Sequence, residues 1–435
     1  MRRVLLALAY VTGLAVAAVA AGSVLPGSSI PPDPDARLTD SSRLVEVPPT
    51  TVGIAFFENR VEARPDDAVS WTALGELYHQ LGRETATDAP FARSEQALRE
   101  AARLAPGYGR AQAALAATLT SRHRFGEAAD IATALLSVDP GRAGALAARG
   151  DALVSVGRYE EAATDYERLH ELDPGPESLA RLAHLRELNG DPYGAIELIE
   201  DAVGSLDGVT GERPAWFLYR LGDLNRHLGR WTEARRAFHA SLQRLDQFPL
   251  ALEGLADVAM KTDALDEAEQ LLERLAAVSP GAPAWLLQAD LAALRGDAEA
   301  SAELLARSID WLEALDPTLA GRDLARVLAD NDIRVDAALA HADAELDRRP
   351  DVFSYDLAAW ARLRSGDVVG ARSAIDQALV LGTLEPSFLY HSALIATAEG
   401  DELRARLDLE RALDINPDFD PFDAPAAAVL LAELS

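Results

Sequence analysis

The stretch AVSWTALGELYHQLGR, at residues 68–83, decides the fold of this chain. Its apolar residues Trp71, Leu74 and Tyr78 follow one another at the three- and four-residue spacing that places side chains on one face of an α-helix. Gly75 lies on the same predicted helix and leaves room for a second helix to approach closely. Because one amphipathic helix cannot bury its apolar face by itself, the stretch predicts a helix packed against a neighbour.

The sequence repeats with a period of 34 residues. This interval separates three prolines and three pairs of small residues: Pro106, Pro140 and Pro174; Ala128 and Ala162; Ala234 and Ala268; Gly366 and Gly400. Each period is expected to hold two amphipathic helices, a tight turn, and a proline that ends the second helix because it lacks the N–H that a helix needs. Such repeats stack into an extended concave surface, which favours binding of a partner over catalysis.

Trp71, Leu74, Gly75 and Tyr78 match the W-x2-L-G-x2-Y signature of the tetratricopeptide repeat, and the sequence resembles that family. Later units carry further positions of the family pattern: Gly150, Gly157, Ala162, Tyr166 and Pro174; Leu218, Leu221, Gly222, Gly229, Ala234 and Phe238; Leu252, Leu255, Ala268, Leu272 and Pro280; Leu389, Ala393, Gly400, Leu409, Ala412 and Pro417. The resemblance implies an all-α fold, namely a right-handed α-solenoid of helix-turn-helix repeats with N- and C-terminal capping helices. The chain is identified as a bacterial or archaeal exported member of that family, and the expectation of export depends on its N-terminal residues.

Five segments are expected along the chain. Residues 1–21 begin with a positive charge and continue as an uncharged, largely apolar run, which predicts a signal peptide or an N-terminal anchor. Residues 22–51 are rich in proline and serine and predict an extended tether. Residues 52–67 are expected to form a capping helix, residues 68–419 about ten repeat units, and residues 420–435 a second capping helix. The protein is therefore expected in the periplasm, at the cell surface or outside the cell.

Three stretches depart from the 34-residue pattern. Extra residues around Glu84 to Pro90 predict a longer surface loop in the first unit, and extra residues near Gly204 to Pro214 predict another loop. The stretch from about Asp316 to Pro350 lacks the usual turn glycine, so looser or kinked stacking is expected there.

Charge and cysteine content narrow the possible partners. The chain carries 70 acidic and 41 basic residues, which gives a formal net charge of −29, and it has no cysteine. This field repels the phosphates of nucleic acids and of anionic lipids. We therefore expect no nucleic acid as a partner, and contact with a membrane only through an uncleaved N-terminal helix. The lack of cysteine excludes disulfides and thiolate sites, and the charge favours a basic protein or peptide.

No motif for catalysis, a cofactor or a metal is present in the sequence. It has no G-x-S-x-G, phosphate-binding loop or dinucleotide fingerprint, and its eight histidines are scattered. Asp414, Asn416, Asp418 and Asp420 alternate as in the first half of a calcium loop, but Phe419 stands where that loop needs glycine. The chain is therefore expected to be non-enzymatic, without a cofactor or a bound metal.

The candidate partner-binding residues lie on the first helices of the units, which line the concave side in this family. Acidic residues recur at or beside the ninth position of five units, and aromatic and basic residues lie near them. Such a surface suits a basic peptide. The candidates are Glu76, His79, Asp151, His184, Trp216, Tyr219, Asp223, Arg226, Asp257, Asp290, Trp360 and Tyr390.

Two functions remain open. The favoured one is an exported scaffold that binds a protein or peptide on its acidic concave surface. The alternative is a structural subunit of a cell-surface or extracellular assembly, built by end-to-end contacts between solenoids.

Overall fold

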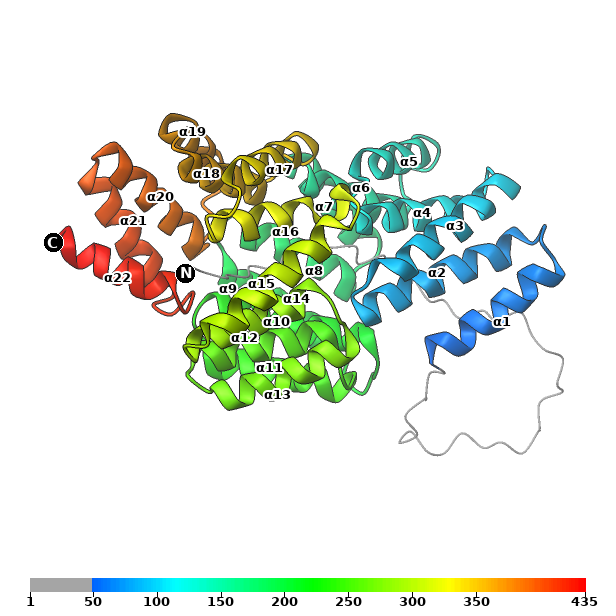
Figure 1. Ribbon diagram of the computed structural model, residues 1–435. Coiled ribbons are helices and arrows are strands. Elements are labelled where there is room, and N and C mark those ends of the chain that lie inside the picture. Colours follow the sequence, from blue (N-terminus) through cyan, green and yellow to red (C-terminus); the bar gives the residue numbers. More distant parts are fainter. Residues whose placement is uncertain (1–48) are drawn as a thin grey trace.

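The computed structural model describes residues 49–435, and these residues form 22 α-helices, with no strand among them (Figure 1). The expected signal peptide or anchor, and nearly all of the expected tether, lie outside the described residues. Between residues 49 and 435, no helix combines the length and the apolar character that crossing a bilayer requires.

Twenty of the helices form ten successive antiparallel pairs, and we number these pairs as units one to ten. The first helices of the units are α2 (Ala68–Thr85), α4 (Gly109–Ser121), α6 (Ala143–Ser155), α8 (Pro176–Leu188), α10 (Glu212–His227), α12 (Pro249–Lys261), α14 (Ala282–Leu294), α16 (Pro317–Asp330), α18 (Val352–Ser365) and α20 (Pro386–Glu399). The second helices are α3 (Asp88–Leu104), α5 (Phe125–Val138), α7 (Tyr159–Leu172), α9 (Pro192–Gly204), α11 (Trp231–Arg244), α13 (Leu265–Val278), α15 (Ala298–Glu313), α17 (Val335–Arg348), α19 (Val368–Ala378) and α21 (Glu402–Ile415). At the two ends, α1 (Thr50–Ala63) packs against α2 and α22 (Asp423–Glu433) packs against α21.

Close approach within each pair explains the small residues of the repeat. In unit three, a Cβ atom added to Gly150 would lie 2.3 Å from Cε1 of Tyr166, so a larger residue does not fit there. Ala162 and Tyr166 of α7 are fully buried at this crossing. The pattern of small and aromatic residues therefore sets the distance between the paired helices, as close packing requires.

The extra residues of unit one do not form the expected surface loop. They lengthen both helices instead, so that α2 has 18 residues and α3 has 17, and only Ala86 and Thr87 lie between them. Ala86 adopts a left-handed φ of 51°, which allows this tight turn. The expectation was wrong because Glu84, Thr85 and the residues after Asp88 continue the two helices. The result is a long hairpin, α2–α3, that projects beyond its neighbours.

The stretch from about Asp316 to Pro350 was expected to stack loosely, and this expectation was wrong as well. It forms α16 and α17, which pack as a pair, and Ala325, Leu328 and Ala342 in these helices are fully buried. Asp332 adopts a left-handed φ of 55° and takes the place of the turn glycine. The apolar faces are intact, and burial of those faces holds the pair together whatever residue forms the turn.

The array winds back on itself, so that α16–α18 lie beside α6–α8 (Figure 1). The turns inside units two to five, with the helix ends that flank them, contact the segments around the starts of α16, α18, α20 and α22, between 189 and 195 residues further along the chain. We call this row of contacts the seam. Its hydrogen bonds join His123 Nδ1 and Thr318 O (3.0 Å), Val352 N and Tyr159 Oη (2.9 Å), Thr383 Oγ1 and Leu188 O (2.6 Å), and Asn416 Nδ2 with Arg226 O (3.3 Å) and His227 O (3.2 Å).

Left-handed turn residues allow the two backbones of the seam to meet. Gly157 and Gly190 have φ values of 72° and 76°, and Cβ atoms at these positions would lie 2.3 Å from Pro350 O and 2.5 Å from Gly382 O. The repeat glycines therefore serve two purposes. They form the turn within a unit, and they admit the neighbouring turn of the superhelix.

Candidate functional site

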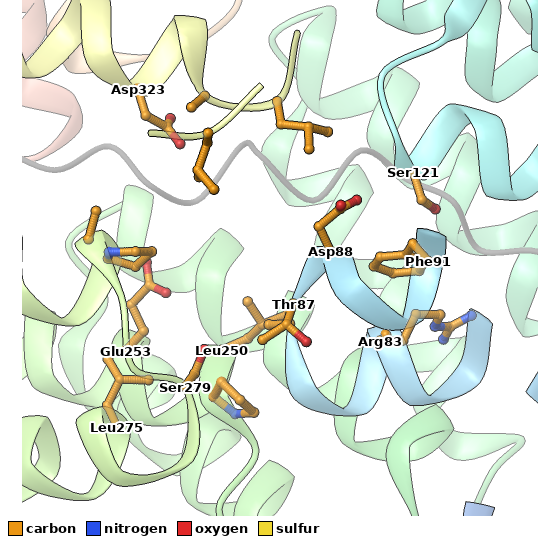
Figure 2. A pocket seen from close by; sticks show the side chains of 18 of the residues that line it. Arg83, Thr87, Asp88, Phe91, Ser121, Leu250, Glu253, Leu275, Ser279 and Asp323 are labelled. Carbon is orange, nitrogen blue, oxygen red and sulfur yellow. The ribbon is translucent and has the colours of Figure 1, made fainter. Parts of the chain in front are cut away.

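A cavity of about 240 Å³ lies inside the superhelix and is partly open to solvent. Three parts of the array surround it: the long α2–α3 hairpin with the neighbouring turn of unit two, the helices α10 and α12–α14, and the region around α15 and α16 (Figure 2). Its walls are largely apolar and include Phe91, Trp216, Leu250, Leu275, Leu286 and Trp311. Residues from units far apart in the sequence thus line one partly open cavity.

An ion pair at the end of α2 fixes the hairpin against unit five. The guanidinium of Arg83 donates to both carboxylate oxygens of Glu212, at 2.8 and 2.9 Å, and Gln80 donates to Glu212 at 3.1 Å. The side chain of Glu212 is 1% exposed and begins α10, where the helix dipole favours a negative charge. The extended length of α2 is what allows Arg83 to reach this carboxylate, so the insertion in unit one builds one side of the cavity.

Four carboxyl groups line the cavity, and they fall into two classes. Glu212 is held by Arg83, and Asp88 accepts a hydrogen bond from Arg122 Nε at 3.1 Å. Glu253 and Asp323 form no hydrogen bond or ion pair with any residue between 49 and 435, and they face the cavity from α12 and α16 (Figure 2).

Burial shifts the titration of these two groups. Removal from water raises the pKa of Glu253 to about 8, and the neighbouring carboxylates Asp257, Asp223 and Asp323 add to this effect while Arg226 opposes it. Burial likewise raises the pKa of Asp323 to about 6, against the opposing charges of Arg349, Arg322 and Arg326. Both carboxyls are therefore poised to change charge near neutral pH.

The sequence-predicted residues of units three and four lie in buried polar contacts. Asp151 accepts hydrogen bonds from Arg181 at 2.7 and 2.8 Å and from the hydroxyl of Tyr166 at 2.8 Å. The side chains of Arg181 and Asp151 are 0% and 2% exposed. His184 lies 3.1 Å from Glu187, which also accepts from Arg220. These contacts hold units three to five together.

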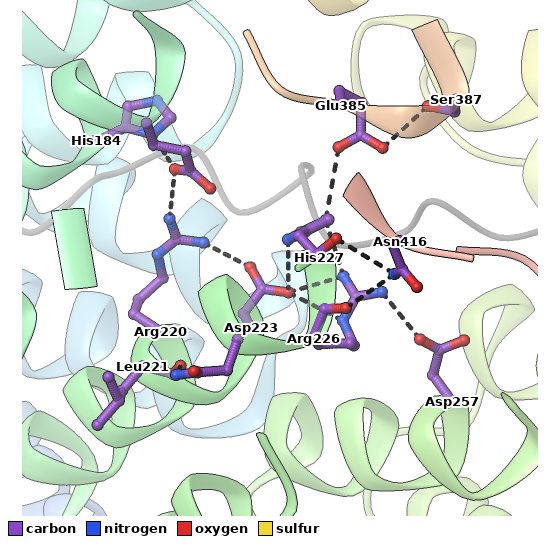
Figure 3. Close-up of polar contacts among 12 residues, drawn as sticks. His184, Arg220, Leu221, Asp223, Arg226, His227, Asp257, Glu385, Ser387 and Asn416 are labelled. Atoms are coloured by element: carbon purple, nitrogen blue, oxygen red, sulfur yellow. Dashed lines mark hydrogen bonds and ion pairs between the residues drawn. The ribbon is translucent and has the colours of Figure 1, made fainter. Parts of the chain in front are cut away.

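Asp223, Arg226 and Asp257 form a continuous network in units five and six (Figure 3). Arg226 donates to Asp223 at 2.8 Å and to Asp257 at 2.9 Å, and Lys261 also donates to Asp257 at 2.8 Å. Burial opposes the shift in both carboxyls, but Lys261 and Arg226 lower the pKa of Asp257, and His227, Arg226 and Arg220 lower the pKa of Asp223. The two carboxylates are thus charged and already paired inside the protein.

The predicted aromatic residues are packed in the interior. Trp360 donates to Asp330 at 2.8 Å and stacks on the ring of His391, with centroids 4.5 Å apart. Tyr390 packs against the ring of Phe419, and Tyr219 packs near Phe238. Their core positions fit the contribution that aromatic burial makes to a packed array.

The remaining predicted residues lie at separate places. Glu76 pairs with Arg110 at 2.7 Å near the surface, and His79 lies 3.0 Å from the hydroxyl of Thr118. Asp290 is buried, its Oδ1 accepts no hydrogen bond from residues 49–435, and burial together with Asp420 and Asp257 raises its pKa well above the usual value. Of the twelve predicted residues, Trp216 lines the cavity. That the twelve residues bind a partner stays a prediction.

Sequence reasoning missed Glu253, Asp323, Phe91 and Trp311 as cavity residues. Glu253 lies on the first helix of unit six, four residues before the predicted Asp257. The insertion at residues 84–90 was the available signal, because it marks the one unit long enough to reach across the superhelix. The position of Asp323 depends on the seam, which no local pattern reveals.

The alternating residues near the C-terminus hold the fold together. Asn416 donates to the seam carbonyls, and Asp420 accepts from the N–H groups of Phe422 and Asp423 at the start of α22, at 2.8 and 2.7 Å. Within the part of the chain that the structure describes, no group of three His, Asp or Glu side chains is arranged to hold a metal ion.

Comparison with known proteins agrees with the helix pairs. Three family models, each described as tetratricopeptide repeat, match residues 143–176, 226–291 and 357–422. No curated protein matches the chain.

Among solved structures, the chain is similar to yeast Tom70, with 14% identity over 88% of this chain and 92% of that chain and a TM-score of 0.40. It is also similar to Cut9 in the APC/C hetero-tetramer Cut9-Hcn1, with 17% identity, 88% and 81% coverage and a TM-score of 0.40. A further similarity is to PilW, a type IV pilus biogenesis factor, with 19% identity, 51% and 99% coverage and a TM-score of 0.42. At this identity, these resemblances say nothing of what this chain binds. With its ten helix pairs and three matched segments, the chain belongs to the tetratricopeptide repeat family.

Proposed function

We propose that this chain is a scaffold that binds a protein or peptide partner on the inner wall of its superhelix, at the cavity. The observation that carries the proposal is the cavity itself, whose apolar wall joins units one, five and six to the region of α15 and α16. Surfaces of this kind, concave and apolar with a few polar groups, are where ligands bind in proteins. The family's repeats are protein-binding modules, and an array of them offers such an inner surface to a partner.

We infer that the acidic groups that favour a basic partner are those of the cavity rather than the sequence-predicted aspartates. Asp151, Asp223 and Asp257 are neutralised by Arg181, Arg226 and Lys261, so they contribute little free charge. Glu253 and Asp323 have no such counter-ion within residues 49–435. We therefore assign the acidic binding surface to the cavity.

Site-specific photocrosslinking tests this function. A diazirine amino acid at Leu250, which lines the cavity, is expected to give one discrete protein adduct in the native cells. The same group at Val138, which is 86% exposed at the end of α5, is the matched control and is expected to give none. Adducts at Val138 together with none at Leu250 would contradict binding at the inner wall.

The alternative function, a subunit of an end-to-end assembly, is supported by one observation. Both terminal helices expose apolar side chains: Val52 and Phe56 on α1, and Val429 on α22. Such ends can pair head to tail and propagate a filament. Light scattering of the purified chain at rising concentration tests this. Growth that Phe56→Ser abolishes would favour the assembly, whereas a concentration-independent monomer would exclude it.

Export is the third part of the proposal, and it depends on residues 1–21. Their positive start and apolar run support cleavage by a signal peptidase. Mass spectrometry of the mature protein is expected to find a chain that begins near Ala21 to Ser23. An intact N-terminus in the membrane fraction would show an anchor, and an intact N-terminus in the cytosol would contradict export.

A further inference from the structure

We propose that the cavity binds one arginine or lysine side chain of the partner, with its cationic end between Glu253 and Asp323 and its aliphatic stem along the apolar wall. This inference rests on the proposed function, because it names the chemistry by which the inner wall recognises a partner. The occupant is a basic residue within an extended segment of another protein.

The first argument is that two of the four carboxyls in the cavity are paired with an arginine and two are not. Each of the other two carboxyls has its arginine, because Arg83 is held at 2.8 Å by Glu212 and Arg122 reaches Asp88 at 3.1 Å. Arg83 is thus committed to Glu212. Glu253 and Asp323 are half-buried and form no hydrogen bond with residues 49–435, so their carboxyl oxygens can accept from a donor that a ligand brings.

The second argument concerns the charges around these two carboxyls. Towards Glu253, α10 presents Asp223 and Arg226, α12 presents Asp257, and α16 presents Asp323. Arg226 is already paired with Asp223 and Asp257, so the surroundings of Glu253 are negative. Near Asp323, Arg322 pairs with Asp351 and Arg349 pairs with Glu345. Arg326 lies 3.8 Å from Asp356. An added cation would therefore face two carboxyls without displacing an existing pair.

The third argument is the shape and chemistry of the wall. Leu250, Leu275 and Leu286 offer apolar surface to the methylene groups of a long basic side chain, which commonly cover apolar surface while their charged end stays polar. Trp216, Trp311 and Phe91 add aromatic surface, on which a guanidinium or ammonium is attracted. A purely apolar ligand would leave both carboxyls unpaired, and an anionic one would be repelled.

Binding of a cation is linked to proton release. Glu253, whose pKa is raised to about 8 by burial, holds its proton at neutral pH in the empty cavity. A bound cation favours the ionised form, so the proton leaves the carboxyl to the buffer. Affinity for the basic side chain is therefore expected to rise as pH increases from 6 to 8.

The test compares two pentapeptides, acetyl-Ala-Ala-Arg-Ala-Ala-amide and the same peptide with the uncharged isostere citrulline in place of arginine. Calorimetric titration of the full chain in two buffers of different ionisation enthalpy measures affinity and proton release together. The arginine peptide is expected to bind about tenfold more tightly than the citrulline peptide, with release of a proton near pH 7. Equal affinities would overturn the inference.

Two cavity variants and one surface control complete the experiment. Glu253→Gln and Asp323→Asn keep the shape of the side chains and are each expected to weaken the arginine peptide by about tenfold, and Glu253→Gln is expected to abolish the proton release. Asp207→Asn, in a loop where the Asp207 side chain is 91% exposed, removes the same charge and is expected to change nothing. Unchanged binding by Glu253→Gln would also overturn the inference.

If Leu250 crosslinks a partner but the chain shows no preference for the arginine peptide, recognition of a basic residue is excluded while the proposed function stands. If the arginine peptide binds preferentially but Leu250 crosslinks no partner, binding of a protein partner at the inner wall is excluded.

Discussion

The hydroxyl of Tyr159 accepts a hydrogen bond of 2.9 Å from the backbone N–H of Val352, 193 residues further along the chain. Tyr159 begins α7 and Val352 begins α18, so the bond joins units three and nine, which are far apart in the sequence. Burial and the nearby Asp351 raise the pKa of Tyr159 above its usual value, which keeps the hydroxyl protonated at any physiological pH. This contact is one member of the seam, and the seam brings α16 and Asp323 over the cavity.

Removal of the Tyr159 hydroxyl is expected to loosen the seam at this point. Tyr159→Phe leaves the Val352 N–H without its acceptor, which should cost about 1–3 kcal/mol. Hydrogen exchange followed by mass spectrometry should show faster exchange in the peptide that contains Val352. Tyr193→Phe is the control, since the side chain of Tyr193 is 60% exposed on α9. Equal exchange in both variants would show that the hydroxyl does not stabilise the seam.

Two glycines with the same backbone conformation separate turn strain from seam contact. Gly190 and Gly400 have φ values of 76° and 78°, but an added Cβ would lie 2.5 Å from Gly382 O at the first and more than 4 Å from any atom at the second. Gly400→Ala should lower the free energy of unfolding by only about 1–2 kcal/mol, because alanine is strained in this left-handed conformation. Gly190→Ala should lower the stability further, as measured by thermal unfolding. Small-angle X-ray scattering should show a larger radius of gyration for Gly190→Ala than for Gly400→Ala. Identical losses of stability in the two variants would mean that the close contact at the seam does not stabilise the fold.

The buried pair Asp151–Arg181 is expected to be costly to break and cheaper to replace. Asp151→Asn leaves the guanidinium of Arg181, which is 0% exposed, without its counter-ion, so a loss of about 3–5 kcal/mol is expected. The double variant Asp151→Leu with Arg181→Met should lose less, because it removes both charges together. Urea unfolding of the single and double variants measures this difference. A double variant that is less stable than both single variants would contradict the expectation.

The stability of the chain should fall as pH rises through the range in which Glu253 keeps its proton only when folded. The pKa of Glu253 is about 8 in the folded chain against a usual value of 4.5, so between these values the folded chain binds a proton that the unfolded chain has lost. Stability from this group is therefore fully present below 4.5 and lost as pH rises towards 8.

Glu253→Gln cannot ionise, and it should be more stable than the wild type at pH 9 by a free energy of unfolding on the order of 3 kcal/mol. At pH 4.5 the two proteins should be similar. Urea unfolding at both pH values measures the difference, with Glu200→Gln as an exposed control on α9. A constant difference across pH would show that Glu253 titrates normally in the folded chain.

Local pattern was sufficient for the helix pairs, but it could not identify the site. Gly150 and Tyr166 indicated a close helix crossing because they occupy the small and aromatic positions of the repeat, as Gly222 and Phe238 do in unit five. Glu84 to Pro90 was interpreted as a loop because an insertion has no partner in the repeat, and helix formation in an insertion depends on what it packs against. The sequence predicted Asp223 and Asp257 as partner-binding residues, but it does not show that Arg226 bridges them.

The sequence by itself determined that this protein is a stack of paired helices, since the spacing of small and apolar residues acts within a few tens of residues. Only the tertiary structure decided which carboxyls remain unpaired, because that depends on the superhelical turn that brings Asp323 of α16 to the same cavity as Glu253 of α12. Small rotations between successive units accumulate along the array, and their sum, which no single repeat encodes, closes the seam and creates the cavity.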